Sequence, residues 1–240
     1  MNRILLMVLR NFPKVPGAYL KLCRYAKHPD RYSEKEMYAH IRYILNMGIE
    51  SGNINLKITG RENLPNENGF IMYSNHQGLF DVVAMVEACE MPIATIFKHE
   101  IKNLPFIKHI AACTNSFPMD RSDDRQSLKV IQNVTSEVMK GRNYLIYPEG
   151  TRSRNGNEMV EFHGGSFRAA VKAKCPVVPV AVIDTYKVFD TKNSAQVDCQ
   201  VHILPPIMPE EYEGLKALDL AETVKQRIRE TIDSNVKNDC

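Results

Sequence analysis

The chain has 240 residues, of which 44% are apolar and 25% are charged, as in a folded protein with one large domain or one domain and an appendage. Its six cysteines lie far apart without a C-x-x-C pair, which argues against a zinc site and a disulfide framework. The net charge of +3 is uneven, because residues 1–50 hold nine Lys and Arg against four Asp and Glu. Membrane surfaces and nucleic acids are the usual partners of such a basic segment.

The chain begins with a short apolar run from Ile4 to Leu9. A bilayer span needs about 20 apolar residues, so no transmembrane segment is predicted here. Farther along, apolar residues repeat at helical spacing beside basic ones, which is typical of a helix lying in the membrane interface. The residues expected to contact the membrane are Ile4, Leu5, Arg10, Tyr19, Lys21, Leu22, Arg24 and Lys27. The alternative is a helix packed on its own domain with solvated lysines. Nucleic acid is disfavoured, since no binding fold or interleaved aromatic pattern accompanies the charge.

A second helix is predicted from Ser33 to about Met47. Ser33 and Glu36 have the spacing of a capping box, and Gly48 and Gly52 are expected to end the helix. We therefore expect an N-terminal, membrane-associating hairpin of two helices in residues 1–50 and a separate α/β domain in residues 51–240.

From Ile54 onward, predicted strands alternate with predicted helices. Strands are expected at 54–58, 70–73, 93–97, 115–117, 143–147, 176–183 and 197–204. Helices are expected at 81–90, in a segment ending near Phe106, and at 124–140, 166–174 and 216–236. Asp81 suits an N-cap, and Leu128, Ile131, Val134 and Val138 suit a buried helix face. This order predicts an α/β fold with a mixed, mostly parallel sheet flanked by helices.

Polar pairs follow four of the predicted strands. They are His76 with Asp81, Lys98 with Glu100, Asp120 with Arg121, and Glu149 with Arg152. The carboxyl ends of parallel strands meet at one edge of a sheet, so these pairs are expected to converge on one crevice. The alternative for any single pair is an ordinary surface or core residue.

These residues carry a resemblance to the glycerolipid acyltransferases, closest to the bacterial 1-acyl-sn-glycerol-3-phosphate acyltransferases. The resemblance covers roughly residues 54–205. Its blocks, in order, are Asn75 to Asp81 (N-H-x-x-x-x-D), Lys98 to Ile101, Phe117 to Arg121, Glu149 to Ser153 (E-G-T-R-S) and Val178 to Ala181. One departure is His163, which stands where the family commonly has a lysine near the substrate phosphate.

The resemblance implies a fold like that of glycerol-3-phosphate acyltransferase and the transfer of a fatty acyl group to the free hydroxyl of lysophosphatidate, giving phosphatidate. The acyl donor is acyl-CoA or acyl carrier protein, and no cofactor or metal is implied. His76 would be the general base, since imidazole has a pKa of about 6.5, and Asp81 would orient it. The substrate-binding residues implied are Lys98, Arg121, Glu149, Gly150, Thr151 and Arg152. Guanidinium groups suit the phosphate, and Glu149 is expected to orient Arg152 or Lys98.

The partners expected are therefore lysophosphatidate, an acyl thioester and an anionic membrane surface. The expected location is the cytoplasmic face of the cell membrane, as a peripheral protein. A serine hydrolase is the first alternative, but the chain has no G-x-S-x-G elbow. A metal enzyme lacks a third clustered ligand in the sequence. Another acceptor, such as glycerol-3-phosphate or another lysophospholipid, and a non-catalytic lipid-binding protein remain open.

Overall fold

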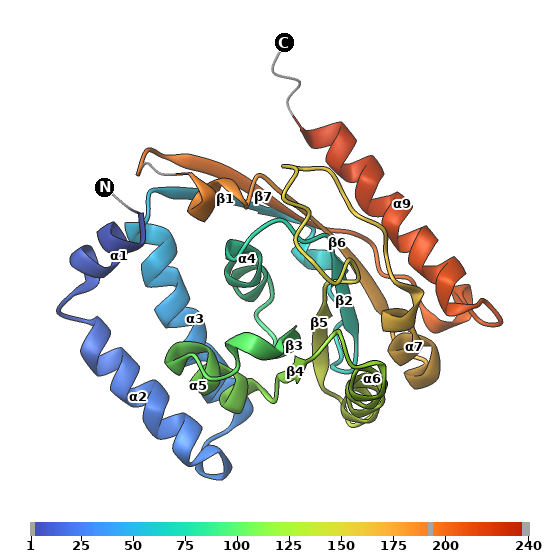
Figure 1. Ribbon diagram of the computed structural model, residues 1–240, viewed down its shortest axis with the longest axis horizontal. Helices are drawn as coiled ribbons and strands as arrows, with labels where there is room; N and C mark the ends of the chain where they lie inside the picture. The colour runs from blue at the N-terminus through green and yellow to red at the C-terminus, as the bar shows by residue number, and fades with distance from the viewer. Residues whose placement is uncertain (1–2, 192–193, 237–240) are drawn as a thin grey trace.

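The computed structural model describes residues 3–191 and 194–236, and it is organised around a seven-stranded sheet (Figure 1). The strand order is β1-β7-β6-β2-β5-β3-β4. The strands are β1 (Ile54–Thr59), β2 (Ile71–Ser74), β3 (Ile93–Lys98), β4 (Phe117–Met119), β5 (Asn143–Ile146), β6 (Val177–Ile183) and β7 (Val197–Ile203). Strands β6, β2, β5, β3 and β4 are parallel to one another, and β7 is antiparallel to β6. The predicted mixed, mostly parallel sheet is confirmed.

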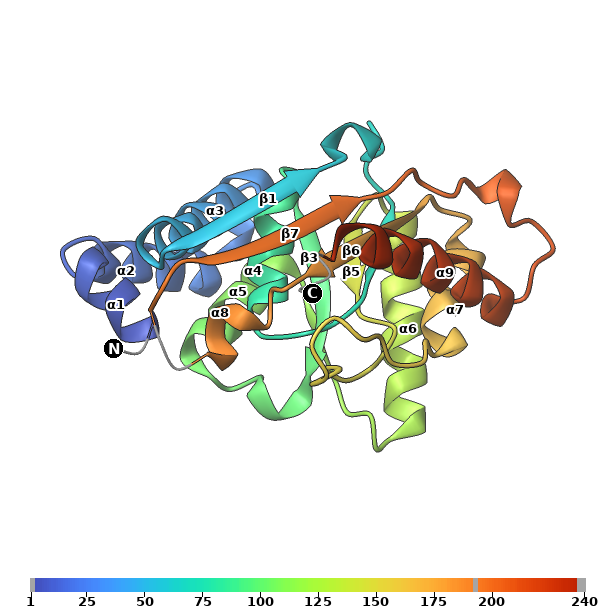
Figure 2. The same cartoon turned by 90° about the horizontal axis from the view of Figure 1, so that it is seen from above.

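Strand β1 pairs in parallel with β7 and forms one edge of the sheet, as Figure 2 shows. Its side chains alternate between partly buried and exposed, as the alternation of Ile54, Leu56 and Ile58 with polar residues predicts. Strand β2, in the middle, is buried at every position. Such a strand reads as a continuous apolar run because helices cover both faces of the sheet.

The helices form a layer on each face of the sheet. Helices α1 (Arg3–Asn11), α2 (Val15–Lys27), α3 (Glu34–Ser51), α4 (Phe80–Ala88) and α5 (Pro105–Thr114) lie on one side, and α6 (Asp124–Met139), α7 (Gly164–Ala173) and α9 (Ala217–Asn235) lie on the other (Figure 1). A short helix, α8 (Lys187–Asp190), follows β6. The central strand β2 contributes to both layers: Met72, with Phe70 just before the strand, joins one hydrophobic core, while Ile71 and Tyr73 join the other.

Within residues 3–51 the structure has three α-helices, where two were expected. A turn at Phe12–Lys14 separates α1 from α2, and Pro16 lies in the first turn of α2. Leu22 is fully buried in the core that also contains Met72, so its predicted contact with a membrane is wrong. Helices α2 and α3 therefore pack directly on the sheet domain. Among the described residues, no helix has the length and apolarity needed to cross a bilayer.

Three helix predictions also need correction. Ser33 caps α3 as expected, with its side chain accepting from the backbone N–H of Glu36, but Gly48 lies inside the helix, which ends only before Gly52. Helix α5 begins at Pro105 rather than ending near Phe106. Leu128 is 45% exposed, because it lies roughly 100° around α6 from the centre of the stripe formed by Val130, Ile131, Val134 and Val138.

Candidate active site

The four predicted polar pairs follow β2, β3, β4 and β5. These strands are mutually parallel, so their carboxyl ends lie along the same edge of the sheet. The structure thus gives the pairs a common edge, as the sequence predicts. The pairs differ in burial: His76 and Asp81 are largely buried, whereas Lys98, Glu100 and Arg121 are exposed.

His76 and Asp81 are in direct contact. His76 Nδ1 lies 2.7 Å from Asp81 Oδ2, and the side chain of His76 is 17% exposed, whereas that of Asp81 is fully buried. A carboxylate accepts hydrogen bonds, so this contact places the ring proton on Nδ1. The other ring nitrogen, Nε2, makes no hydrogen bond within the described chain and carries the basic lone pair.

Asp81 is not the N-cap that the sequence suggests. Helix α4 begins at Phe80, and the carboxylate of Asp81 turns back toward the loop before it. Its Oδ2 accepts from the backbone N–H groups of Gln77, at 2.6 Å, and Gly78, at 3.0 Å, in addition to His76. Its Oδ1 accepts from the Thr185 hydroxyl at 2.6 Å. Four donors thus satisfy a buried charge and fix its orientation.

Thr185 and the side chains around it were missed by the sequence analysis. Thr185 is fully buried just after β6, and its backbone N–H donates to Gln77 Oε1 at 3.1 Å. Gln77 Nε2 donates to Asn157 Oδ1, and Asn157 Nδ2 donates to Asp184 Oδ1. These contacts connect the loop after β2 to the segment after β6 over more than 100 positions of sequence. The only local signal was polarity directly after the apolar run of β6.

Tyr147 and Glu149, in the segment just after β5, both contact His76. The rings of Tyr147 and His76 stack with centroids 4.2 Å apart, and Glu149 Oε1 accepts from the backbone N–H of His76 at 3.1 Å. Glu149 is 1% exposed, and its Oε2 has no partner in the described chain. Burial raises the pKa of Glu149 to about 7. The expectation that Glu149 orients Arg152 or Lys98 is wrong, since it forms no ion pair with either within the described residues.

The E-G-T-R-S loop lies against the His76 loop. The backbone N–H of Ser153 donates to the carbonyl of His76 at 2.9 Å. Gly150 has φ +67°, and a Cβ there would lie 3.3 Å from the ring of His163, so the turn favours glycine. The ring of His163 is thus next to this loop. Thr151 is exposed and Arg152 half-buried.

Lys98, Glu100 and Arg121 form the second, exposed group. Lys98 Nζ lies 2.8 Å from a carboxylate oxygen of Glu100, and both side chains are more than half exposed. The nearby Lys98 lowers the pKa of Glu100. Arg121 follows β4 and is exposed. No hydrogen bond or ion pair in the described chain joins this group to His76 or Asp81. The described residues also contain no cluster of three or more His, Cys, Asp or Glu suited to a metal ion.

This arrangement can perform acid–base chemistry. A histidine oriented by a buried carboxylate, with Nε2 unengaged, can accept a proton from a hydroxyl placed against it. The arginine and lysine side chains along the same edge are suited to a phosphate.

The sequence of this chain is similar to those of known acyltransferases over most of its length. A family model described as acyltransferase matches residues 55–183, more than half of the chain. The 1-acyl-sn-glycerol-3-phosphate acyltransferase of Salmonella typhimurium is 30% identical over 169 residues, which cover 69% of each chain. The Saccharomyces cerevisiae protein of the same name is 29% identical over 183 residues, covering 75% of this chain. The matched part spans 60% of the yeast protein and 65% of an Ovis aries relative.

The fold is also shared with a solved structure. The crystal structure of the lysophosphatidate acyltransferase PlsC from Thermotoga maritima matches with a TM-score of 0.76 over 98% of both chains, at 17% sequence identity. The α/β fold with a mostly parallel sheet, which the sequence predicts, is thus shared with PlsC from Thermotoga maritima. On the family match and the Salmonella relative, this chain belongs to the acyltransferase family.

Proposed function

We propose that the protein transfers a fatty acyl group from an acyl thioester to the free hydroxyl of 1-acyl-sn-glycerol-3-phosphate. The observation that carries this proposal is the 2.7 Å contact between His76 Nδ1 and Asp81 Oδ2, which leaves Nε2 without a protein partner in the described chain. The acyl donor is acyl-CoA or acyl carrier protein, and the product is phosphatidate. The named activity of the curated relatives is the same.

The reaction requires one base and no protein nucleophile. As the acceptor oxygen attacks the thioester carbonyl, His76 Nε2 takes the hydroxyl proton, and Asp81 stabilises the imidazolium that forms. When the tetrahedral intermediate collapses, the C–S bond breaks and the new ester forms. The imidazolium then returns its proton to the leaving thiolate, so His76 is neutral again and the products are an ester and a thiol.

The acceptor phosphate would be bound by cations along the same edge of the sheet. Arg152 is on the loop whose Ser153 donates to the His76 carbonyl, which supports its assignment to a phosphate bound near His76. Arg121 and Lys98 lie at the ends of the two neighbouring strands, β4 and β3. We assign these three side chains to the phosphate, and Gly150 and Thr151 to the loop that approaches it.

Residues 1–50 would attach the protein to a membrane surface as a peripheral protein. One face of α1 and the turn after it exposes large apolar side chains: Ile4 51%, Leu5 49%, Val8 44%, Leu9 56% and Phe12 67%. An apolar face of this kind on a basic segment is suited to insertion between anionic headgroups. Arg10 instead holds α1 in place, since its guanidinium donates to the Ser51 carbonyl at 2.8 Å.

The activity is tested with the purified chain, an acyl-CoA and lysophosphatidate, following thiol release and phosphatidate by mass spectrometry. We expect thiol release that depends on the acceptor, and a loss of roughly 10³-fold in turnover for His76→Ala with the fold retained. Thiol release without acceptor, or near wild-type turnover in His76→Ala, would contradict the proposal. A panel with glycerol-3-phosphate and other lysophospholipids identifies the acceptor.

Membrane attachment is tested by substitution on α1 rather than by deletion, since removing residues 1–30 would uncover the core around Leu22 and Tyr25. Replacing both Leu9 and Phe12 by Gln should sharply reduce co-sedimentation with anionic vesicles. Leu128→Gln on α6, also an exposed leucine, is the matched control and should bind as wild type does. Equal binding by both variants would contradict the assignment of α1.

A further inference from the structure

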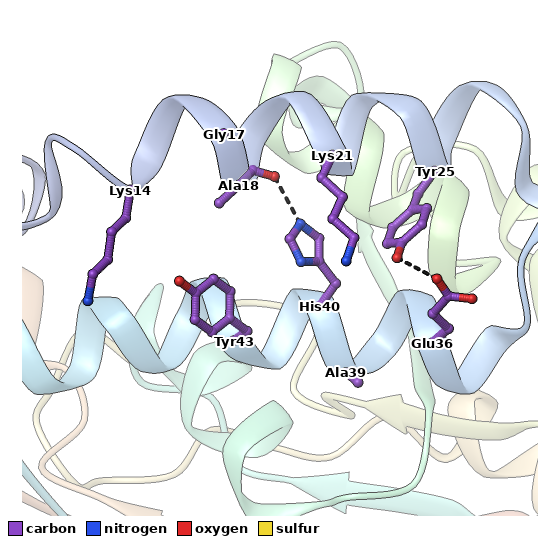
Figure 3. Close-up of a pocket in the computed structure, with 9 residues that line it drawn as sticks. All are labelled: Lys14, Gly17, Ala18, Lys21, Tyr25, Glu36, Ala39, His40 and Tyr43. Atoms are coloured by element: carbon purple, nitrogen blue, oxygen red, sulfur yellow. Dashed lines mark hydrogen bonds between the residues drawn. The ribbon is translucent and has the colours of Figure 1, made fainter.

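A hollow of about 580 Å³ lies between α2 and α3, away from the candidate active site. Figure 3 shows the two helices antiparallel, with side chains from each pointing across the hollow toward the other. Its lining is Lys14, Gly17, Ala18, Lys21, Tyr25, Glu36, Ala39, His40 and Tyr43. Small residues keep it open: a Cβ added at Gly17 would meet no atom within 4 Å. We call this hollow the α2–α3 groove.

His40 is the buried polar group of the groove. It is 8% exposed, and its Nε2 lies 2.9 Å from the Ala18 carbonyl, which can only accept, so Nε2 carries the proton. Its Nδ1 is then an acceptor in the neutral ring, and it has no hydrogen-bond partner in the described chain. Tyr43 stacks on the ring and Tyr25 packs edge-on against it, so the ring orientation is fixed. The groove thus presents one fixed acceptor that the hydroxyl group of a ligand can satisfy.

Two lysines supply positive charge to the same groove. Lys14 and Lys21 both extend from α2 toward α3 (Figure 3), and neither forms a salt bridge with a described residue. They are seven positions apart, about 10 Å along the helix, a span that two extended lysine side chains can close onto one phosphate. Glu36, at the far end, accepts from the Tyr25 hydroxyl at 2.7 Å. Lysine is a good point-charge partner for phosphate.

We propose that the α2–α3 groove binds the phosphoglycerol headgroup of an anionic phospholipid. Lys14 and Lys21 contact the phosphate, and His40 Nδ1 accepts from a glycerol hydroxyl. A serine headgroup fits less well, because it brings an ammonium group next to the two lysines. This inference rests on the proposed membrane attachment, since the lipid would be presented by the bilayer into which the apolar face of α1 inserts.

The decisive variant is Gly17→Leu, which fills the groove without changing charge. The protein is mixed with phosphatidylcholine vesicles containing either phosphatidylglycerol or an equal mole fraction of phosphatidylserine, and the ratio of the two partition coefficients is measured. We expect wild type to favour phosphatidylglycerol by roughly fivefold, equivalent to about 1 kcal/mol. Gly17→Leu should reduce the ratio to about one, with unchanged acyl transfer to detergent-dispersed lysophosphatidate. Gly165→Leu, at another open glycine on α7, should keep the wild-type ratio.

A pair of charge variants separates the groove from diffuse attraction. Replacing Lys14 and Lys21 by Gln should abolish the preference, whereas replacing the exposed Arg24 and Lys27 by Gln removes the same charge and should keep it. A ratio near one in wild type, or a ratio that survives Gly17→Leu, overturns the groove proposal alone. Failure of wild type to bind any vesicle overturns it together with membrane attachment, while acyl transfer in detergent is judged separately.

Discussion

Asp81 is fully buried and accepts four hydrogen bonds, whereas Lys98 is more than half exposed and contacts one equally exposed carboxylate. Asp81 comes after β2 and Lys98 ends β3, and these two parallel strands are separated by β5, so both residues lie at the same edge of the sheet. The difference shows that the ring of His76, the proposed base, is oriented by the fold itself, as catalysis by a positioned group would require. Lys98 is held by a single exposed ion pair, so a bound phosphate would fix the orientation of its side chain.

The largest effect is expected from Asp81→Asn, at the centre of the buried group. The amide oxygen can still accept at the Oδ2 position, but the negative charge that would stabilise an imidazolium is lost, and an amide nitrogen at the Oδ1 position cannot accept from the Thr185 hydroxyl. We expect a fall in kcat of roughly 10²–10³-fold, no larger than the loss for His76→Ala, because Asp81 would act only through His76. The exposed Asp233→Asn is the control with the same change of charge. A loss below tenfold would show that the fold does not need Asp81 to orient the base.

The next effect concerns stability and tests the burial of Glu149. Its folded-state pKa, raised to about 7, exceeds the ordinary value of 4.5, so the folded chain retains a proton that the unfolded chain releases. The free energy of unfolding should therefore fall as pH rises from about 4.5 to about 7, by at most about 3 kcal/mol, and level off above that. In Glu149→Gln, this decline in the free energy of unfolding between about pH 4.5 and 7 should be absent. Urea titrations at several pH values measure it.

The control for that experiment is Glu158→Gln, an exposed acid on the same segment. Its unfolding free energy should follow the wild-type curve across the whole pH range. Parallel curves for wild type and Glu149→Gln would mean that Glu149 ionises as freely in the folded chain as in the unfolded one.

The cations assigned to the acceptor phosphate are tested by Arg152→Ala. If Arg152 binds the acceptor phosphate, the KM for lysophosphatidate should rise by roughly 10–100-fold, since a hydrogen bond to a charged group contributes about 1.5–3 kcal/mol. The kcat at saturating acceptor should change far less, because the base is held independently. Arg125→Ala on α6 serves as the matched loss of an exposed arginine. An unchanged KM would remove Arg152 from the phosphate site.

The smallest effect is expected at Thr185, where one hydrogen bond to Asp81 is removed. Thr185→Val keeps the shape of the side chain and should lower kcat by about tenfold, or about 1.4 kcal/mol, with little change in KM. Thr185→Ser retains the hydroxyl and should recover most of the activity. Equal activities of the two variants would show that the hydroxyl does not help to hold Asp81.

The sequence predicts the fold well where local pattern decides it. The alternation of Ile54, Leu56 and Ile58 predicts a half-buried strand, and the apolar run before His76 predicts a buried one. The structure places the first at an edge of the sheet and the second in its middle. Parallel strands then bring their polar ends to one edge. The sheet and the pairing of His76 with Asp81 could therefore be predicted from the sequence.

The sequence does not reveal what depends on distant contacts. Thr185 reaches Asp81 from the segment after β6, more than 100 residues away, and its only local signal is polarity after an apolar run. Asp81 was expected to be an N-cap because its residue type suits that position. Its carboxylate instead accepts hydrogen bonds from the ring of His76 and from the backbone N–H groups of Gln77 and Gly78. Leu22 matches an interfacial helix by spacing, yet α2 buries that face in the core.

A double-mutant cycle on His76 and Asp81 tests the central claim most directly. If Asp81 acts by holding His76 as the base, then the loss of kcat in the combined His76→Ala and Asp81→Asn variant should equal that of His76→Ala alone. All variants are compared at saturating acyl-CoA and lysophosphatidate, with folding checked by circular dichroism. Losses that multiply would show that the two side chains act independently and would contradict the account.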